Sequence, residues 1–210
     1  MKKKLLIIGA SGHGKVVADI AMKMDKWEKI AFLDDNNNIG NTMGIKIIGN
    51  TDLAFKYLPE CDIFVGIGNN DIRQMFQEKL EAAGASIPVL IHPKAIIGEN
   101  VQIGKGSVIM AGVVINCCTR IGKGCIINTG STIDHDNFID DFVHISPGVH
   151  LAGTVKVGKK SWIGIGSSVI NNIFITDECL IGAGAVVVNN LMNSGTYIGI
   201  PAKEITTRRR

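Results

Sequence analysis

An imidazole between two carboxylates is the strongest sign of chemistry in this sequence, at Asp134-His135-Asp136. The pKa of an imidazole lies near neutrality, so His135 could take a proton from an attacking nucleophile as a general base. A neighbouring carboxylate, either Asp136 or Asp134, would fix the tautomer of the ring and stabilise the imidazolium that forms. The triplet indicates proton-transfer chemistry and argues against a purely structural protein.

A second group of chemistry-bearing residues lies near the start of the chain, where glycines follow the first apolar run. Their spacing is G-x-x-G-x-G, which differs from the G-x-G-x-x-G of dinucleotide sites. It favours a mononucleotide whose phosphates meet a helix N-terminus near Ser11, Gly12 and His13. Asp34 or Asp35 would then accept hydrogen bonds from the base or the ribose. The alternative is a glycine turn that only permits tight packing.

Composition excludes several classes of protein. The formal net charge is +3, from 22 Lys and Arg against 19 Asp and Glu, and the tail Arg208-Arg209-Arg210 supplies this excess, so no nucleic-acid partner is expected. No stretch approaches the roughly 20 apolar residues of a membrane span. The first apolar run is broken too early for a signal peptide, which predicts a cytoplasmic protein. The 5 Cys lack CxxC spacing and are interpreted as reduced packing residues, with no metal expected.

A repeat in the second part of the chain must position His135. From Ile91 to Val187 an aliphatic residue returns at every sixth position without interruption. This period predicts a parallel β-helix with three short strands per coil, the aliphatic anchors stacked inside and the coils about 4.8 Å apart. Residues 18 apart then share one column along the axis. Because no loop interrupts the period, a site in this part must use residues of the coils themselves.

Residues 1–85 are predicted to form a small α/β domain, and residues 86–210 the β-helix with a C-terminal tail. The expected strands are Lys4–Ile8, Ile30–Leu33 and Ile63–Ile67, and the expected helices are Lys15–Met24 and a segment from about Asn70 to Ala83. Strands and helices alternate, which is typical of a small Rossmann-like parallel sheet. Its ligand should bind at the carboxyl ends of the strands, where the glycine turn and the two later loops converge.

Several stretches of the chain match a known family. They are Gly9 to Gly14, Phe32-Leu33-Asp34-Asp35, Ile67-Gly68-Asn69-Asn70 with Arg73, Asp134-His135-Asp136, Val143-His144, Ala152-Gly153 and Gly199-Ile200-Pro201-Ala202-Lys203. On these stretches the chain resembles the bacterial sugar acyltransferases of the sialic acid O-acetyltransferase type, most of all the UDP-N-acetylbacillosamine N-acetyltransferases. The resemblance spans nearly the whole chain. It implies a left-handed β-helix of hexapeptide repeats, acetyl-CoA as co-substrate and a homotrimer.

The resemblance also implies roles for particular residues. A histidine followed by an acid is the general base of the family, which makes His135 the base and Asp136 its partner, where the family has Glu. His144 would contact the thioester end of acetyl-CoA, and the backbone N–H of Gly153 would face the thioester carbonyl. The residues that match the nucleotide-sugar contacts are Ser11, Gly12, His13, Asp34, Asp35 and Gly68. A competing interpretation of His144 is a packing histidine next to Trp162.

Two further positions, Ile165 and Ala183, match residues that border the pantetheine arm, the latter being Gly in the family. They differ by 18 and share one column, as do His135 and Gly153, but the two columns lie on different faces of the prism. A single groove can touch both columns only if it lies between two prisms. The spacing therefore predicts an oligomer with active sites at subunit interfaces, and the family's homotrimer has this geometry.

The sequence thus predicts an acetyl-CoA-dependent N-acetyltransferase that acts by direct attack on the 4-amino group of a UDP-linked 2-acetamido-4-amino-2,4,6-trideoxyhexose. The main alternative is O-acetylation of sialic acid or another sugar hydroxyl. The exact sugar and the choice of UDP, GDP or dTDP stay open. Remoter alternatives are a covalent route through Cys117, a nucleotide-binding scaffold, and a zinc-dependent β-helix hydratase. The hydratase would need His144 and His150 to converge across an interface with a third ligand. His92 and His150 are otherwise interpreted as structural.

Overall fold

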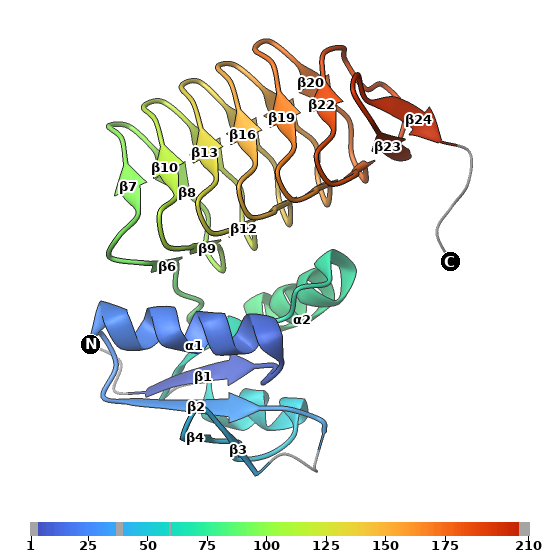
Figure 1. Cartoon of the computed structure of the whole chain (residues 1–210). Helices are drawn as coiled ribbons and strands as arrows, with labels where there is room; N and C mark the ends of the chain where they lie inside the picture. The colour runs from blue at the N-terminus through green and yellow to red at the C-terminus, as the bar shows by residue number, and fades with distance from the viewer. Residues whose placement is uncertain (1–3, 37–39, 59, 206–210) are drawn as a thin grey trace. The chain divides into compact units, whose positions relative to one another are not determined.

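The structure is a computed structural model that describes residues 4–36, 40–58 and 60–205 of the chain (Figure 1). It consists of two compact units, Met1–Pro93 and Lys94–Arg210. The tail Arg208-Arg209-Arg210 lies outside the described residues. In the described part of the chain, no helix is both long and apolar enough to cross a membrane.

The first unit extends to Pro93, whereas the sequence predicts a boundary after residue 85. The reason is that the segment after residue 85 is bonded to the sheet of the first unit. The N–H of Ile63 donates to the carbonyl oxygen of Ser86 at 2.9 Å, and the Ser86 hydroxyl donates to Oδ1 of Asp62 at 2.7 Å. These contacts attach Ser86, one residue past the predicted boundary, to the sheet of the first unit.

The first unit contains the predicted parallel sheet, with strand order β2-β1-β5. The three strands are β1 (Lys4–Ile8), β2 (Lys29–Leu33) and β5 (Asp62–Val65). Alternating with them are α1 (Gly12–Met24), η1 (Thr51–Tyr57, a 3₁₀ helix) and α2 (Asn70–Ala82). A small antiparallel hairpin of β3 (Asn41–Thr42) and β4 (Ile45–Lys46) precedes η1, and neither was expected from the sequence. Strands β1, β2 and β5 are rich in buried aliphatic residues, as strands covered on both faces are.

Helix α1 begins at Gly12 rather than at the expected Lys15, so the glycine turn runs into the first helical turn. Gly14 lies within this first turn, and the position requires glycine because a Cβ there would lie 1.9 Å from the carbonyl oxygen of Gly9. Strand β5 ends at Val65 instead of Ile67. The carbonyl oxygen of Ile67 accepts a hydrogen bond from the guanidinium of Arg73 in α2 instead of pairing with a neighbouring strand.

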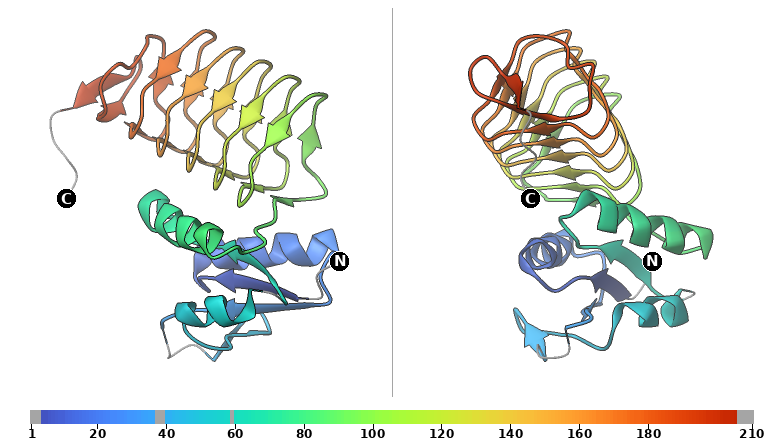
Figure 2. Two further views of the ribbon diagram at one scale, coloured as in Figure 1. Left: turned by 180° about the vertical axis from the view of Figure 1, so that it is seen from behind. Right: turned by 90° about the vertical axis from the view of Figure 1, so that its right-hand side faces the viewer.

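The second unit is a parallel β-solenoid with three two-residue strands per coil, as the period of six predicts (Figure 2). Its first face consists of β7 (Ile96–Ile97), β10 (Val114–Ile115), β13 (Thr132–Ile133), β16 (His150–Leu151), β19 (Ser168–Val169) and β22 (Val186–Val187). Its second face consists of β8 (Gln102–Ile103), β11 (Arg120–Ile121), β14 (Phe138–Ile139), β17 (Lys156–Val157) and β20 (Phe174–Ile175). Its third face consists of β9 (Val108–Ile109), β12 (Ile126–Ile127), β15 (His144–Ile145), β18 (Trp162–Ile163), β21 (Leu180–Ile181) and β23 (Thr196–Ile198).

Pairing in the solenoid follows the predicted spacing of 18, as between Ile115 and Ile133. The anchors from Ile109 to Val187 are buried, whereas those of the first coils are only partly buried. The strand β6 (Leu90–Ile91) contains Ile91, the first anchor of the period. One short strand outside the period had no counterpart in the prediction: β24 (Lys203–Ile205), which pairs antiparallel with β23.

Each corner of the solenoid is made by a residue with a left-handed backbone conformation. Between the third and first faces these residues are glycines, such as Gly166 with φ of 66°. Between the first and second faces they are side-chain-bearing residues, among them Cys118, Asp136 and Thr154 with φ of 61°, 58° and 60°. Asp and Asn tolerate this conformation better than most residues. The corner between the first and second faces can therefore carry functional side chains.

Candidate active site

His135 lies at the corner between the first and second faces, directly after β13. Its Nδ1 atom is 2.8 Å from Oδ2 of Asp136, and the two side chains are 54% and 58% exposed. The hydrogen bond with Asp136 raises the pKa of His135 above its ordinary value of 6.5. Of the two carboxylates that the sequence left open, Asp136 therefore contacts the ring.

Asp134 holds the backbone of His135 rather than its ring. Its Oδ1 atom accepts a hydrogen bond from the His135 N–H at 2.9 Å and another from Nδ2 of Asn116, one coil earlier, at 2.8 Å. The bond from Asn116 and that from the His135 N–H lower the pKa of Asp134. Asn116 was not among the residues singled out from the sequence, although its spacing of 18 from Asp134 would have signalled the contact.

The ring of His135 lies against Gly153, one coil further along the same column. A Cβ on Gly153 would be 2.7 Å from both Cε1 and Nε2 of His135, so only glycine leaves room for the imidazole in this position. The 18-residue spacing thus brings the proposed base next to the backbone that was expected to face the thioester carbonyl. Cys117 lies in the same column, one coil before His135. Both Cys117 and the neighbouring Cys118 are exposed free thiols, so the packing role expected of the cysteines is wrong for these two.

The other solenoid residues assigned by resemblance lie elsewhere on the coils. His144 is on β15 in the third face and is 9% exposed. It stacks on Trp162, with ring centroids 5.1 Å apart, and its Nε2 is 3.3 Å from Nδ2 of Asn128. Ile165 and Ala183 are exposed at the corner between the third and first faces. Within one chain the structure therefore does not bring these three residues together with His135.

The two carboxylates at the end of β2 hold loops of the first unit. Oδ2 of Asp34 accepts a hydrogen bond from the N–H of Ala10 at 2.7 Å, and its Oδ1 accepts one from Asn36 at 2.8 Å. Oδ1 of Asp35 accepts hydrogen bonds from the N–H and the hydroxyl of Thr51, at 2.9 and 3.0 Å. A carboxylate has about four acceptor positions, so both retain capacity for a ligand. Thr51 gave no signal in the sequence.

His13 lies in the first turn of α1 beside Gly68, whose Cβ position would be 4.0 Å from the Cβ of His13. The Nε2 atom of His13 is buried and has no hydrogen-bond partner among the described residues. Burial, followed by the nearby charge of Arg73, lowers the pKa of His13 from 6.5 to about 4. Ser11 and Gly12 are exposed at the start of the same helix. A neutral imidazole and free helix N–H groups together can bind a phosphate.

Arg73 of α2 fixes the loop that carries Gly68. Its side chain is buried, and Nη1 donates to the carbonyl oxygens of Ile67 and Gly68 at 3.1 and 2.9 Å. Nη2 donates to Oδ1 of Asn70 at 2.7 Å. In the sequence, Arg73 is only part of a stretch that matches the family, and nothing there indicates this role.

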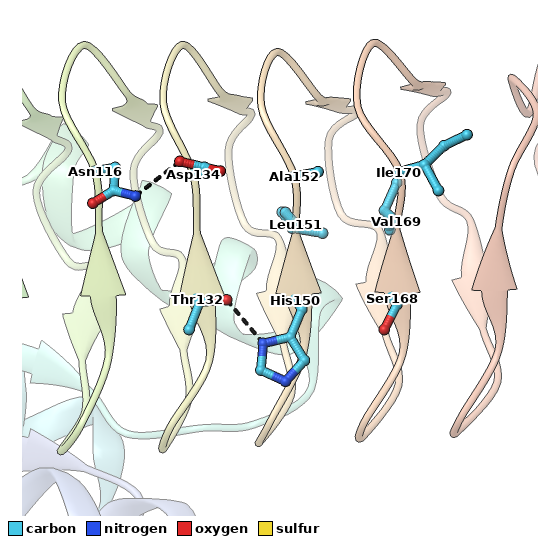
Figure 3. Close-up of a pocket in the computed structure, with 9 residues that line it drawn as sticks. All are labelled: Asn116, Thr132, Asp134, His150, Leu151, Ala152, Ser168, Val169 and Ile170. Atoms are coloured by element: carbon cyan, nitrogen blue, oxygen red, sulfur yellow. Dashed lines mark hydrogen bonds between the residues drawn. The ribbon is translucent and has the colours of Figure 1, made fainter.

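A shallow pocket of about 430 Å³ opens on the first face of the solenoid (Figure 3). It is lined by Asn116, Thr132, Asp134, His150, Leu151, Ala152, Ser168, Val169 and Ile170. In it, Nδ1 of His150 lies 2.8 Å from the hydroxyl oxygen of Thr132. His150 and His144 are on different faces, and the described residues of one chain contain no cluster of three metal-ligating side chains. One chain therefore does not assemble the zinc site considered from the sequence.

Comparison with known proteins gives matches over both units. The family model described as PglD N-terminal domain matches residues 4–80, and the model of bacterial transferase hexapeptide repeats matches residues 100–135. The acetyltransferase domain of PglB from Neisseria gonorrhoeae FA1090, solved in complex with acetyl coenzyme A, is 42% identical, with a TM-score of 0.94 over 98% of this chain and 100% of that chain. PerB from Caulobacter crescentus, solved with CoA and GDP-perosamine, is 35% identical, with a TM-score of 0.90 over 96% of this chain and 97% of that chain. A UDP-N-acetylbacillosamine N-acetyltransferase of Bacillus subtilis (strain 168) is 36% identical over 115 residues, 52% of either protein.

Proposed function

This chain belongs to the family of PglD-type hexapeptide-repeat sugar N-acetyltransferases, and we propose that its acceptor is a UDP-linked 2-acetamido-4-amino-2,4,6-trideoxyhexose. Membership of the family makes it an acetyl-CoA-dependent N-acetyltransferase of nucleotide-linked 4-amino sugars. The likeness over nearly the whole chain to a domain solved with acetyl coenzyme A, in a chain whose His135-Asp136 pair lies against Gly153, supports acetyl transfer. The observation that carries the UDP-linked acceptor is the 36% identity to a UDP-N-acetylbacillosamine N-acetyltransferase.

In the proposed reaction His135 is the general base. Its Nδ1 donates to Asp136, which leaves the lone pair of Nε2 to accept a proton from the sugar amine as the nitrogen attacks the thioester carbonyl carbon. The carboxylate of Asp136 stabilises the imidazolium that results, and Asp134 holds the backbone of the base in place.

The backbone N–H of Gly153 binds the carbonyl oxygen as it gains negative charge. The carbon–sulfur bond then breaks, and the imidazolium of His135 returns its proton to the CoA thiolate that leaves. His144, held in its stack by Trp162, contacts the thioester end of acetyl-CoA, and Ile165 and Ala183 border the pantetheine arm. No covalent enzyme intermediate is required in this route.

The first unit binds the nucleotide. The phosphates meet the first N–H groups of α1 at Ser11 and Gly12, and the neutral ring of His13 supplies a hydrogen-bonding atom that the fold leaves without a partner. Asp34 and Asp35 accept hydrogen bonds from the ribose or the base. Gly68 keeps this side of the pocket free of a side chain, on a loop that Arg73 holds.

Activity measurements with a panel of acceptor sugars test the proposed acceptor. Release of free CoA thiol from acetyl-CoA is measured with the UDP-, GDP- and dTDP-linked forms of the 4-amino sugar and with free sialic acid. We expect the highest kcat/KM with the UDP-linked amine. A preference for GDP-perosamine would refute the UDP-linked acceptor and leave the acetyltransferase, whereas acetylation of free sialic acid alone would support the O-acetyltransferase alternative.

The proposed site is completed only in a homotrimer, because His135 and Ile165 lie at different corners of one solenoid. Complementation tests this step. An inactive His135→Ala chain is co-refolded with an inactive Ala183→Trp chain, whose added indole blocks the pantetheine wall from an exposed position. Mixed trimers contain interfaces in which both intact corners meet, so part of the activity should return. Hybrid trimers confirmed by mass that stay inactive would refute the shared site.

A further inference from the structure

The first face of the solenoid differs from the second in the side chains that point outward from its strands. On the first face these residues carry no fixed charge: Ile96, Val114, Thr132, His150, Ser168 and Val186. On the second face they include two cations: Gln102, Arg120, Phe138, Lys156 and Phe174. Interface cores between protein chains are depleted of charged residues. Of these two faces, the first is therefore the one better suited to burial against further copies of this chain. The third face is also uncharged, but its Val108 and Ile126 are already buried within the chain.

The two groups of candidate site residues mark the two edges of this same face. The corner with His135 and Gly153 follows the first-face strands, and the corner with Ile165 and Ala183 precedes them. In the homotrimer, a step that rests on the proposed function, the first corner of one chain meets the second corner of the next. The face between the corners then turns toward the three-fold axis in every chain.

Polar side chains occupy the middle of this face, between apolar ones at both ends. Thr132, His150 and Ser168 lie on adjacent strands, with Val114 before them and Val186 after them. Against the axis, these groups would be removed from water together with their copies, and buried polar atoms without partners are costly. The first face therefore needs partners for its central polar band.

His150 is held so that one nitrogen remains for such a partner. Its Nδ1 is 2.8 Å from the Thr132 hydroxyl oxygen, its side chain is exposed, and it borders the pocket of about 430 Å³ (Figure 3). A histidine that binds a metal through one ring nitrogen donates its other N–H to an acceptor, which fixes the tautomer. The Thr132 hydroxyl can accept that bond, which leaves the lone pair of Nε2 for a cation.

We propose that the three His150 side chains of the trimer bind one divalent cation of borderline softness, such as Zn²⁺, on the three-fold axis through their Nε2 atoms. Three imidazoles with nitrogen–metal distances of about 2.0–2.1 Å and one water form a tetrahedral set. The ion joins the three chains and takes no part in acetyl transfer. The sequence predicts no metal because one chain supplies a single ligand, and three copies are required for the site.

Metal binding to the chelator-treated trimer tests this site, with Co²⁺ as probe because tetrahedral Co²⁺ absorbs strongly in the visible range. We expect one Co²⁺ per three chains, displaced by one equivalent of Zn²⁺. His150→Asn and His150→Gln should abolish the absorption while the mass of the trimer is unchanged. Thr132→Val, which removes only the acceptor for Nδ1–H, should weaken binding by about 10- to 100-fold.

A matched control separates this site from the active site. His135→Ala removes another exposed solenoid histidine and should bind Co²⁺ like the parent while losing acetyl transfer. An active trimer that binds no Co²⁺, that binds one ion per chain, or whose His150→Asn variant binds equally well would overturn the axial site and leave the proposed function intact. A monomeric parent would refute the trimer itself, and the axial site with it.

Discussion

Two histidines, one in each unit, show how differently the two parts of this protein build a site. His135 stands at an exposed corner of the solenoid, where a carboxylate raises its pKa. His13 has a buried Nε2 atom at the start of α1, and burial together with Arg73 lowers its pKa to about 4. The first is suited to gain a proton during a reaction and the second to stay neutral. The same side chain thus serves as a base in one unit and as a neutral ligand in the other.

Each histidine also depends on glycines, but for different reasons. Gly153 leaves space for a side chain, the ring of His135. Gly14 leaves space for backbone, the carbonyl of Gly9. A side chain at an exposed corner can move when crowded, whereas a helix packed against a strand end has little freedom to move. Crowding should therefore affect chemistry in the solenoid and stability in the α/β unit.

The largest effect should come from removing the base of the solenoid. His135→Ala should lower turnover by about 10²- to 10⁴-fold, the usual contribution of a general base, with little change in acetyl-CoA binding. Steady-state kinetics and a binding titration with acetyl-CoA measure the two quantities. Lys156→Ala, at an exposed position on the second face, is the control and should behave like the parent. Turnover within about twofold of the parent would remove His135 from the mechanism.

Substitution of a glycine by alanine should affect stability in the α/β unit and turnover in the solenoid. Gly14→Ala places a Cβ 1.9 Å from a carbonyl oxygen and should lower the free energy of unfolding by about 1–3 kcal/mol or more. Gly153→Ala crowds only the His135 ring, at 2.7 Å, and should lower turnover by about 10²-fold with little loss of stability. Denaturant titration and kinetics measure both variants.

Gly12 provides the control for the two glycine substitutions. Gly12→Ala adds a Cβ with nothing within 4 Å and should leave the stability unchanged or slightly raised. If Gly153→Ala destabilised the fold as much as Gly14→Ala, the solenoid corner would be as rigid as the helix packing, and the contrast between the units would be lost.

Acid should destabilise the α/β unit through His13. The unfolded chain binds this proton with the ordinary pKa of 6.5 and the folded chain only near 4, so stability present above pH 6.5 is lost as the pH falls from 6.5 through 4. The loss should reach about 3 kcal/mol at most. Unfolding free energies of parent and His13→Gln across this range measure the effect, and equal slopes for the two proteins would contradict it.

Loss of a loop carboxylate should raise the KM for the nucleotide sugar and leave the KM for acetyl-CoA unchanged. Asp34→Ala removes the acceptor for the N–H groups of Ala10 and Asn36 and should raise the KM for the nucleotide sugar by about tenfold. Asp35→Ala should act similarly through Thr51. The KM for acetyl-CoA should stay unchanged in both variants. A change in the acetyl-CoA constant instead would show that the two ligands are assigned to the wrong units.

The smallest effect is expected from the partner of the base. Asp136→Asn leaves the proton acceptor in place but removes the carboxylate whose hydrogen bond, followed by its charge, raises the pKa of His135. The pKa should fall toward 6.5, and the acid limb of the kcat/KM profile should shift to lower pH, because the base stays unprotonated further into acid. Turnover should fall less than in His135→Ala. An acid limb at the same pH as the parent's would show that Asp136 does not tune the base.

The sequence predicts contacts best in the solenoid, because residues at a fixed spacing in its period of six lie next to one another. Parallel pairing fixes the neighbour of each residue 18 positions away, so the contact of His135 with Gly153 followed from spacing. The same rule, applied to Asp134, would have found Asn116. In the α/β unit the alternation of strands and helices could be anticipated, but the hairpin of β3 and β4 and the helix η1 could not, because their sequences carry no regular period.

What the sequence by itself determined is therefore the repeat, the alternation of strands and helices, the column of His135, and a family likeness that the comparisons confirm. Only the tertiary structure decided that Asp136 rather than Asp134 contacts the ring, that Thr51 binds Asp35, and that Arg73 holds the loop of Gly68. Rotamers and loop contacts of this kind depend on packing between segments at no fixed spacing. In a periodic backbone the spacing in the sequence gives the neighbours of each residue, whereas the contacts of a loop are set by the folded tertiary structure.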